Sequence, residues 1–89
     1  MDVTVAFTTQ LKAALGKSEQ TITLDEGATV GQAIQALSAI YPDEFSRLVL
    51  AGGTLMPSIL LSVNDGQVQE DAEIFDGDTI TLLSAISGG

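Results

Sequence analysis

The chain has 89 residues, of which 45% are apolar and 17% charged, which is the size and composition of one small domain with its own core. Three Lys and Arg residues against twelve Asp and Glu residues give 3 − 12 = −9, a charge that disfavours nucleic acids and anionic membrane surfaces as partners. The absence of Cys and His rules out disulfides, thiol nucleophiles and imidazole chemistry, as well as zinc and iron–sulfur sites.

The first residues show no basic segment followed by an apolar one, and no apolar run approaches about 18 residues, the length that spans a bilayer. We therefore expect a cytoplasmic protein. The charge is uneven, because all six charged residues after Arg47 are acidic. This asymmetry predicts that the second half of the chain seeks a basic partner.

The first third of the chain predicts a β-hairpin. Apolar residues alternate with Thr and Ala over residues 3–8, which is typical of a half-buried strand. Residues 9–19 form a connector with one or two helical turns that end at Gly16, a residue suited to a left-handed turn. A second strand over residues 21–24 pairs with the first in antiparallel fashion.

The clearest predicted helix begins at Thr29. Thr29 and Gln32 have the spacing of a capping box, in which each side chain satisfies a backbone amide at the start of a helix. Pro42 ends the helix because it has no amide hydrogen, and it also opens a second short helical piece. The apolar residues at helical spacing are Val30, Ala33, Ile34, Leu37, Ile40 and Tyr41.

The second half predicts a loop and another hairpin. Residues 51–57 contain two glycines and a proline, and we expect a loop there. Alternation over residues 59–63 predicts a strand, and Asn64-Asp65-Gly66 is a hairpin signal that leads to a short return strand at residues 67–68.

A last strand follows the turn at residues 76–78. It covers residues 79–83, and a tail of small residues runs from 84 to 89. The expected fold is α+β, a ubiquitin-like β-grasp in which one main helix packs on a mixed sheet of four to five strands. The domain spans residues 1–83, with the first and last strands as neighbours at the centre of the sheet.

Three polar patterns have functional and structural interpretations. Gly16-Lys17-Ser18 resembles the end of a phosphate-binding loop, but Leu11 occupies the place of its first glycine, so a turn is favoured. Gly52-Gly53 lacks a following Lys, which favours a loop over an anion site. Five acidic residues do not have the spacing of a calcium loop, so a solvated acidic surface is favoured over a metal site; they are Glu70, Asp71, Glu73, Asp76 and Asp78.

The pair Gly88-Gly89 is the most informative feature of the sequence. A segment without side chains can enter a narrow cleft, and the group that it carries is the α-carboxylate of Gly89. A carboxylate is ionised at neutral pH and is a poor electrophile, so a partner must activate it.

With this tail, the chain resembles the small β-grasp sulfur carriers, namely the molybdopterin-synthase small subunit, the thiamine-pathway carrier and the cysteine-pathway carrier. The resemblance extends over nearly the whole chain. It rests on Asp2-Val3-Thr4-Val5, Ala28-Thr29-Val30-Gly31-Gln32-Ala33, Ser62-Val63-Asn64-Asp65-Gly66, Asp76-Gly77-Asp78-Thr79-Ile80 and Ser87-Gly88-Gly89.

The resemblance implies a protein that is not itself an enzyme and binds no cofactor or metal of its own. A ubiquitin-activating-type adenylyltransferase would use ATP and Mg²⁺ to adenylate Gly89, while Ser87 and Gly88 lie in its cleft. Sulfide or a persulfide would then displace AMP to give a thiocarboxylate, which a sulfur-accepting synthase consumes. Because the chain has no Cys, the sulfur must come from another protein.

A docking surface is predicted from strand periodicity. Ala6, Leu60 and Leu83 should face away from the main helix, and with Ile86 we expect them to form a patch that contacts the partner. The alternative is that Leu60 and Leu83 complete the core.

Two observations bear on the pathway. Molybdopterin-synthase small subunits often carry two prolines before the final glycines, whereas residues 82–87 here contain none. Residues 51–57 resemble the corresponding segment of the longer cysteine-pathway carriers more than that of the shorter thiamine-pathway carriers, so the cysteine pathway is favoured. Two other functions stay open: a protein modifier that joins lysines through the same tail, and a plain β-grasp binding module.

Overall fold

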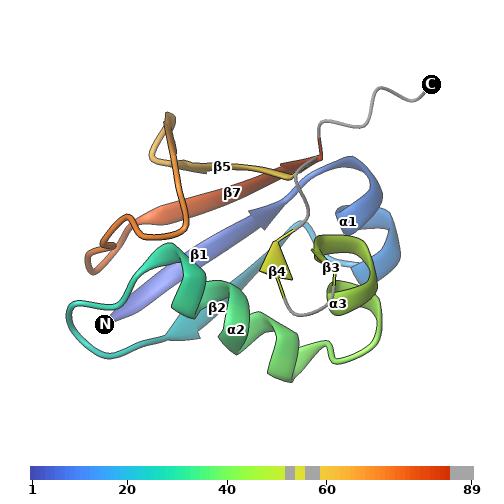
Figure 1. Ribbon diagram of the computed structural model, residues 1–89, viewed down its shortest axis with the longest axis horizontal. Helices are drawn as coiled ribbons and strands as arrows, with labels where there is room; N and C mark the ends of the chain where they lie inside the picture. Colours follow the sequence, from blue (N-terminus) through green and yellow to red (C-terminus); the bar gives the residue numbers. More distant parts are fainter. Residues whose placement is uncertain (52–53, 56–58, 85–89) are drawn as a thin grey trace.

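The computed structural model describes residues 1–51, 54–55 and 59–84. Its main sheet has five strands in the order β2-β1-β7-β5-β6, with the helices gathered on one face (Figure 1). The predicted β-grasp fold is confirmed. The strands are β1 (Asp2–Phe7), β2 (Glu19–Thr23), β5 (Ile59–Val63), β6 (Gly66–Val68) and β7 (Thr79–Ser84).

The strands that come first and last in the chain, β1 and β7, pair at the centre of the sheet, as predicted. β1 and β7 are parallel, with Val5 opposite Ile80, and β7 is also antiparallel to β5. β1 and β2 form the expected antiparallel hairpin. Because β7 has a neighbour on each side, the strand that leads to the tail is held by two ladders.

The main helix α2 (Val30–Ile40) begins with the predicted capping box. The amide of Gln32 donates to the Thr29 hydroxyl at 3.3 Å, and the amide of Thr29 donates to the Gln32 side chain at 2.8 Å. The placement of Ile40 in the buried stripe is wrong, because its side chain is 47% exposed. The last turn runs beyond the buried part of the helix, and Tyr41 closes the core there, edge to face with Phe7.

The segment predicted as a loop at residues 51–57 contains part of a small second sheet. β3 (Leu50–Ala51) pairs with β4 (Thr54–Leu55) in antiparallel fashion. Two strands of this length are too short to leave an alternating pattern in the sequence, which is why the pattern predicted only a loop.

Two short helices close one end of the core. α1 (Thr9–Leu15) and α3 (Glu44–Val49) contact each other, and Leu11 and Phe45 are almost fully buried. No helix within the described ranges has both the length and the apolar character needed to cross a bilayer. The buried core comprises Val3, Val5, Phe7, Leu11, Ile22, Ala28, Val30, Ala33, Ile34, Leu37, Phe45, Val49, Ile59, Leu61, Ile74, Ile80 and Leu82.

The β5–β6 hairpin has the predicted tight turn. Asn64 and Asp65 have positive φ angles of 49° and 78°, as a two-residue type I′ turn requires. Gly66 is therefore the first residue of β6 rather than a central turn residue.

Candidate functional site

The face of the main sheet opposite the helices carries two exposed leucines. Leu60 on β5 and Leu83 on β7 are directly opposite each other in the antiparallel ladder and are 37% and 45% exposed. Their neighbours Ile59, Leu61 and Leu82 are buried on the helix side. The alternative that Leu60 and Leu83 complete the core is therefore wrong.

Ala6 lies on the same face, one row away from the leucines. It is half-buried and opposite Thr81, which is in turn opposite Ser62 on β5. Small side chains in this row leave the two leucines prominent. We call Ala6, Leu60 and Leu83 the outer patch. Its role in docking stays a prediction, and the other predicted site residues, Ile86, Ser87, Gly88 and Gly89, lie outside the described residues.

The end of β7 is fixed by a side chain that the sequence analysis did not single out. The hydroxyl of Thr8 donates to the carbonyl of Leu82 at 2.9 Å. Thr8 is the N-cap of α1, yet its side chain does not cap that helix. The sequence does contain one signal for this. A capping box needs Glu or Gln three residues after the cap, and Leu11 stands there, so the Thr8 side chain is not committed to a capping box.

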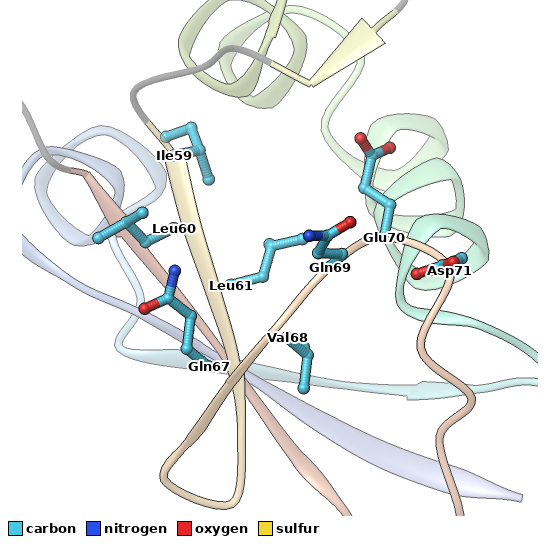
Figure 2. Close-up of a pocket in the computed structure, with 8 residues that line it drawn as sticks. All are labelled: Ile59, Leu60, Leu61, Gln67, Val68, Gln69, Glu70 and Asp71. Atoms are coloured by element: carbon cyan, nitrogen blue, oxygen red, sulfur yellow. The ribbon is translucent and has the colours of Figure 1, made fainter.

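The sequence analysis also did not predict a groove that lies beside the outer patch. It has a volume of about 420 Å³ and lies between β5 and the segment that follows β6 (Figure 2). Exposed carboxylates of Glu70 and Asp71 stand at its rim. The residues that line it are Ile59, Leu60, Leu61, Gln67, Val68, Gln69, Glu70 and Asp71.

The Gly16-Lys17-Ser18 segment is a helix end rather than a phosphate loop. Gly16 has a φ of 71°, and its amide donates to the carbonyl of Lys12 as the C-cap of α1. The carboxyl end of a helix carries partial negative charge, which repels an anion. The interpretation as a glycine turn is confirmed.

Two of the acids expected on a solvated surface, Asp76 and Asp78, also have structural partners. Asp78 accepts hydrogen bonds from the amide of Phe75 and the side chain of Asn64, both at 2.9 Å. Asp76 accepts from the amide of Asp2 at 2.8 Å. These carboxylates hold the turn before β7 against the start of β1 and the β5–β6 hairpin.

Comparison with known proteins agrees with this fold. The sequence pattern of the ThiS family matches residues 5–89, which is nearly the whole chain. The chain belongs to the ThiS family. The resemblance to the β-grasp sulfur carriers is thereby confirmed at the level of the family, and the match includes the tail. No curated protein sequence matches the chain significantly.

Three solved structures illustrate the similarity. SAMP1 from Haloferax volcanii is 26% identical, with a TM-score of 0.89 over 100% of both chains. A chain of the BexX/CysO complex from Amycolatopsis orientalis is 32% identical, with a TM-score of 0.74 over 98% of this chain and 99% of that one. Urm1 from Trypanosoma brucei is 25% identical, with a TM-score of 0.76 over 99% and 95%.

Proposed function

We propose that this protein is a sulfur carrier whose Gly89 carboxylate is activated by a ubiquitin-activating-type adenylyltransferase. The observation that carries the proposal is the ThiS-family match that runs through Gly88-Gly89. β7 ends at Ser84, so 89 − 84 = 5 residues remain, which reach about 17 Å when extended. The two ladders of β7 and the Thr8 hydrogen bond give this tail a fixed origin.

The chemistry takes place on the partner in two steps. A Gly89 carboxylate oxygen attacks the α-phosphorus of ATP, pyrophosphate leaves, and Mg²⁺ held by the partner neutralises the phosphate charge. Hydrosulfide then attacks the carbonyl carbon and AMP leaves, which gives the thiocarboxylate. If a persulfide is the donor, a thiol must also reduce the resulting acyl disulfide.

The outer patch is the surface by which we propose that the carrier docks on this enzyme. Leu60 and Leu83 are exposed apolar side chains next to the end of β7, so a partner that covers them also reaches the tail. The BexX/CysO complex contains a protein similar to this one together with a partner. A sulfur-accepting synthase would use the same tail after activation.

Intact mass spectrometry tests the proposal. The full chain is incubated with its adenylyltransferase, ATP, Mg²⁺ and sulfide, and we expect one oxygen to be replaced by sulfur at Gly89. Deletion of Gly89 should abolish this product and leave the melting temperature unchanged, because the core lies within residues 3–82. An unchanged mass for the full chain, under conditions in which the same enzyme converts another carrier of the family, would contradict the proposal.

A second candidate is a protein modifier, favoured by the similarity to SAMP1, the small archaeal modifier protein 1 of Haloferax volcanii. Mass spectrometric searches for conjugates usually look for the short glycine remnant that trypsin leaves on a modified lysine, and they would not detect conjugates of this protein. No Lys or Arg follows Arg47, so trypsin would leave 89 − 47 = 42 residues on the acceptor lysine. Cleavage after Asp78 would leave 89 − 78 = 11 residues, a practical signature. If neither species forms, the plain binding module is favoured.

A further inference from the structure

The groove beside the outer patch exists because the last hairpin opens. β6 pairs with β5 only from Val63 to Leu61, and the last pair is Leu61 with Val68. Beyond this pair the chain departs from β5, and the hollow of about 420 Å³ lies in the gap (Figure 2). Ile59 remains paired on its other side, with Ser84 of β7, so this part of β5 is held in place.

The groove has four apolar lining residues, all from β5 and β6. Ile59, Leu61 and Val68 line it, and Leu60 is shared with the outer patch. Leu60 points to one side of β5, whereas Leu61 points to the other side, toward Gln69 (Figure 2). The hollow is large enough for one large apolar side chain.

The rim of the groove is acidic and held in position. Glu70 and Asp71 are exposed, and the described lining contains no Lys or Arg. The carbonyl of Glu70 accepts a hydrogen bond from the amide of Gly31 at 2.9 Å, and that of Ala72 accepts from Val30 at 3.0 Å. The backbone of the rim is therefore fixed to the start of α2, so only the side chains of Glu70 and Asp71 need ordering when a partner binds.

We propose that this groove is a selectivity site for the protein that docks on the outer patch. It receives an extended segment that carries a large apolar side chain next to an Arg or Lys. The apolar lining residues contact the apolar side chain, and the carboxylates of Glu70 and Asp71 pair with the Arg or Lys. Because Leu60 belongs to both the groove and the outer patch, one partner can contact both surfaces. The identity of that partner as the adenylyltransferase rests on the proposed function.

Charge reversal tests the groove. In the double variant Glu70→Lys/Asp71→Lys, we expect the KM of the adenylyltransferase for the carrier to rise roughly tenfold with kcat unchanged, because like charges would then meet. The backbone hydrogen bond of Glu70 does not depend on its side chain. The matched control is Asp25→Lys/Glu26→Lys, an exposed acidic pair outside the groove. Each double variant changes the net charge from −9 to −9 + 4 = −5.

Two outcomes would overturn the proposal: a KM within about twofold of wild type for the groove variant, or an equal rise for the control. Melting temperatures establish that both variants fold.

A second experiment tests the groove without the adenylyltransferase. The isotopically labelled full chain is titrated with a capped peptide that has a leucine between two arginines. We expect NMR shifts at Ile59–Leu61 and Gln67–Asp71 that the groove variant abolishes. If the wild type is not adenylated but these shifts occur, only the proposed function fails; without the shifts, the groove proposal fails too.

Discussion

At the scale of single residues, polar side chains connect the last strand to the rest of the sheet. The side chain of Asn64 accepts a hydrogen bond from the amide of Thr79 at 3.0 Å and donates to Asp78 at 2.9 Å. Asn64 also has the positive φ that its turn requires. Through these contacts Asn64 and Asp78 position the start of β7.

Thr8 performs the same task at the other end of β7. We expect Thr8→Val to lower the free energy of unfolding by about 1 kcal/mol, because the Leu82 carbonyl loses its donor. No helix cap is lost, since the Thr8 side chain does not cap α1. Amide exchange at Leu83 and Ser84 should become faster. The control Thr8→Ser keeps the hydroxyl and should behave as wild type, whereas a Thr8→Val variant as stable as wild type would contradict this role of the hydrogen bond.

At the scale of elements, β7 separates the buried face of the sheet from the outer patch. Leu82 is fully buried and Leu83 is 45% exposed, although they are adjacent in the chain. Side chains of successive strand residues point to opposite faces, so one strand serves both the core and the outer patch.

This pair of leucines gives a matched test. We expect Leu82→Ala to lower the free energy of unfolding by about 2–5 kcal/mol through the cavity it leaves. Leu83→Arg should change stability by less than about 1 kcal/mol, because the site is exposed, and should strongly reduce activation by the partner. The control for added charge is Thr21→Arg, because Thr21 on β2 is exposed on the same face of the sheet as Leu83. Normal activation of Leu83→Arg would count against the outer patch.

At the scale of the whole molecule, four of the six acids that follow Arg47 lie in two regions. Asp76 and Asp78 are hydrogen-bonded in the turn where β7 begins, whereas Glu70 and Asp71 line the groove beside Leu60. The expectation that the second half attracts a basic partner stays a prediction, and Glu70 and Asp71 are the acids that lie in the groove next to the outer patch.

One continuous core predicts a single unfolding transition. Tyr41 is the chain's only tyrosine, there is no tryptophan, and its ring meets Phe7 of β1 at a centroid distance of 6.3 Å. Its fluorescence therefore reports on the junction of α2 and the sheet. We expect the denaturant midpoints from Tyr41 fluorescence and from far-UV circular dichroism to coincide. Separate midpoints would indicate that the α2 end unfolds independently of the sheet.

Several features could be predicted because their signals are local. The capping box of Thr29 and Gln32 and the turn at Asn64-Asp65 depend on residues close in the chain, and both are present. The outward direction of Leu60 and Leu83 followed from strand alternation. The exposure of Ile40 did not follow from helical spacing, because spacing does not say how far the sheet extends beneath the helix.

The sequence alone determined the β-grasp order of elements, the family and the tail on which the proposed function depends, since hydrophobic periodicity, caps and terminal glycines are written in consecutive residues. Only the tertiary structure decided that Thr8 holds the end of β7, that Asp76 and Asp78 fasten a turn, and that an acidic groove adjoins the outer patch. The physical reason is separation along the chain. Thr8 and Leu82 meet only when β1 and β7 pair, and the groove forms only where β6 leaves β5.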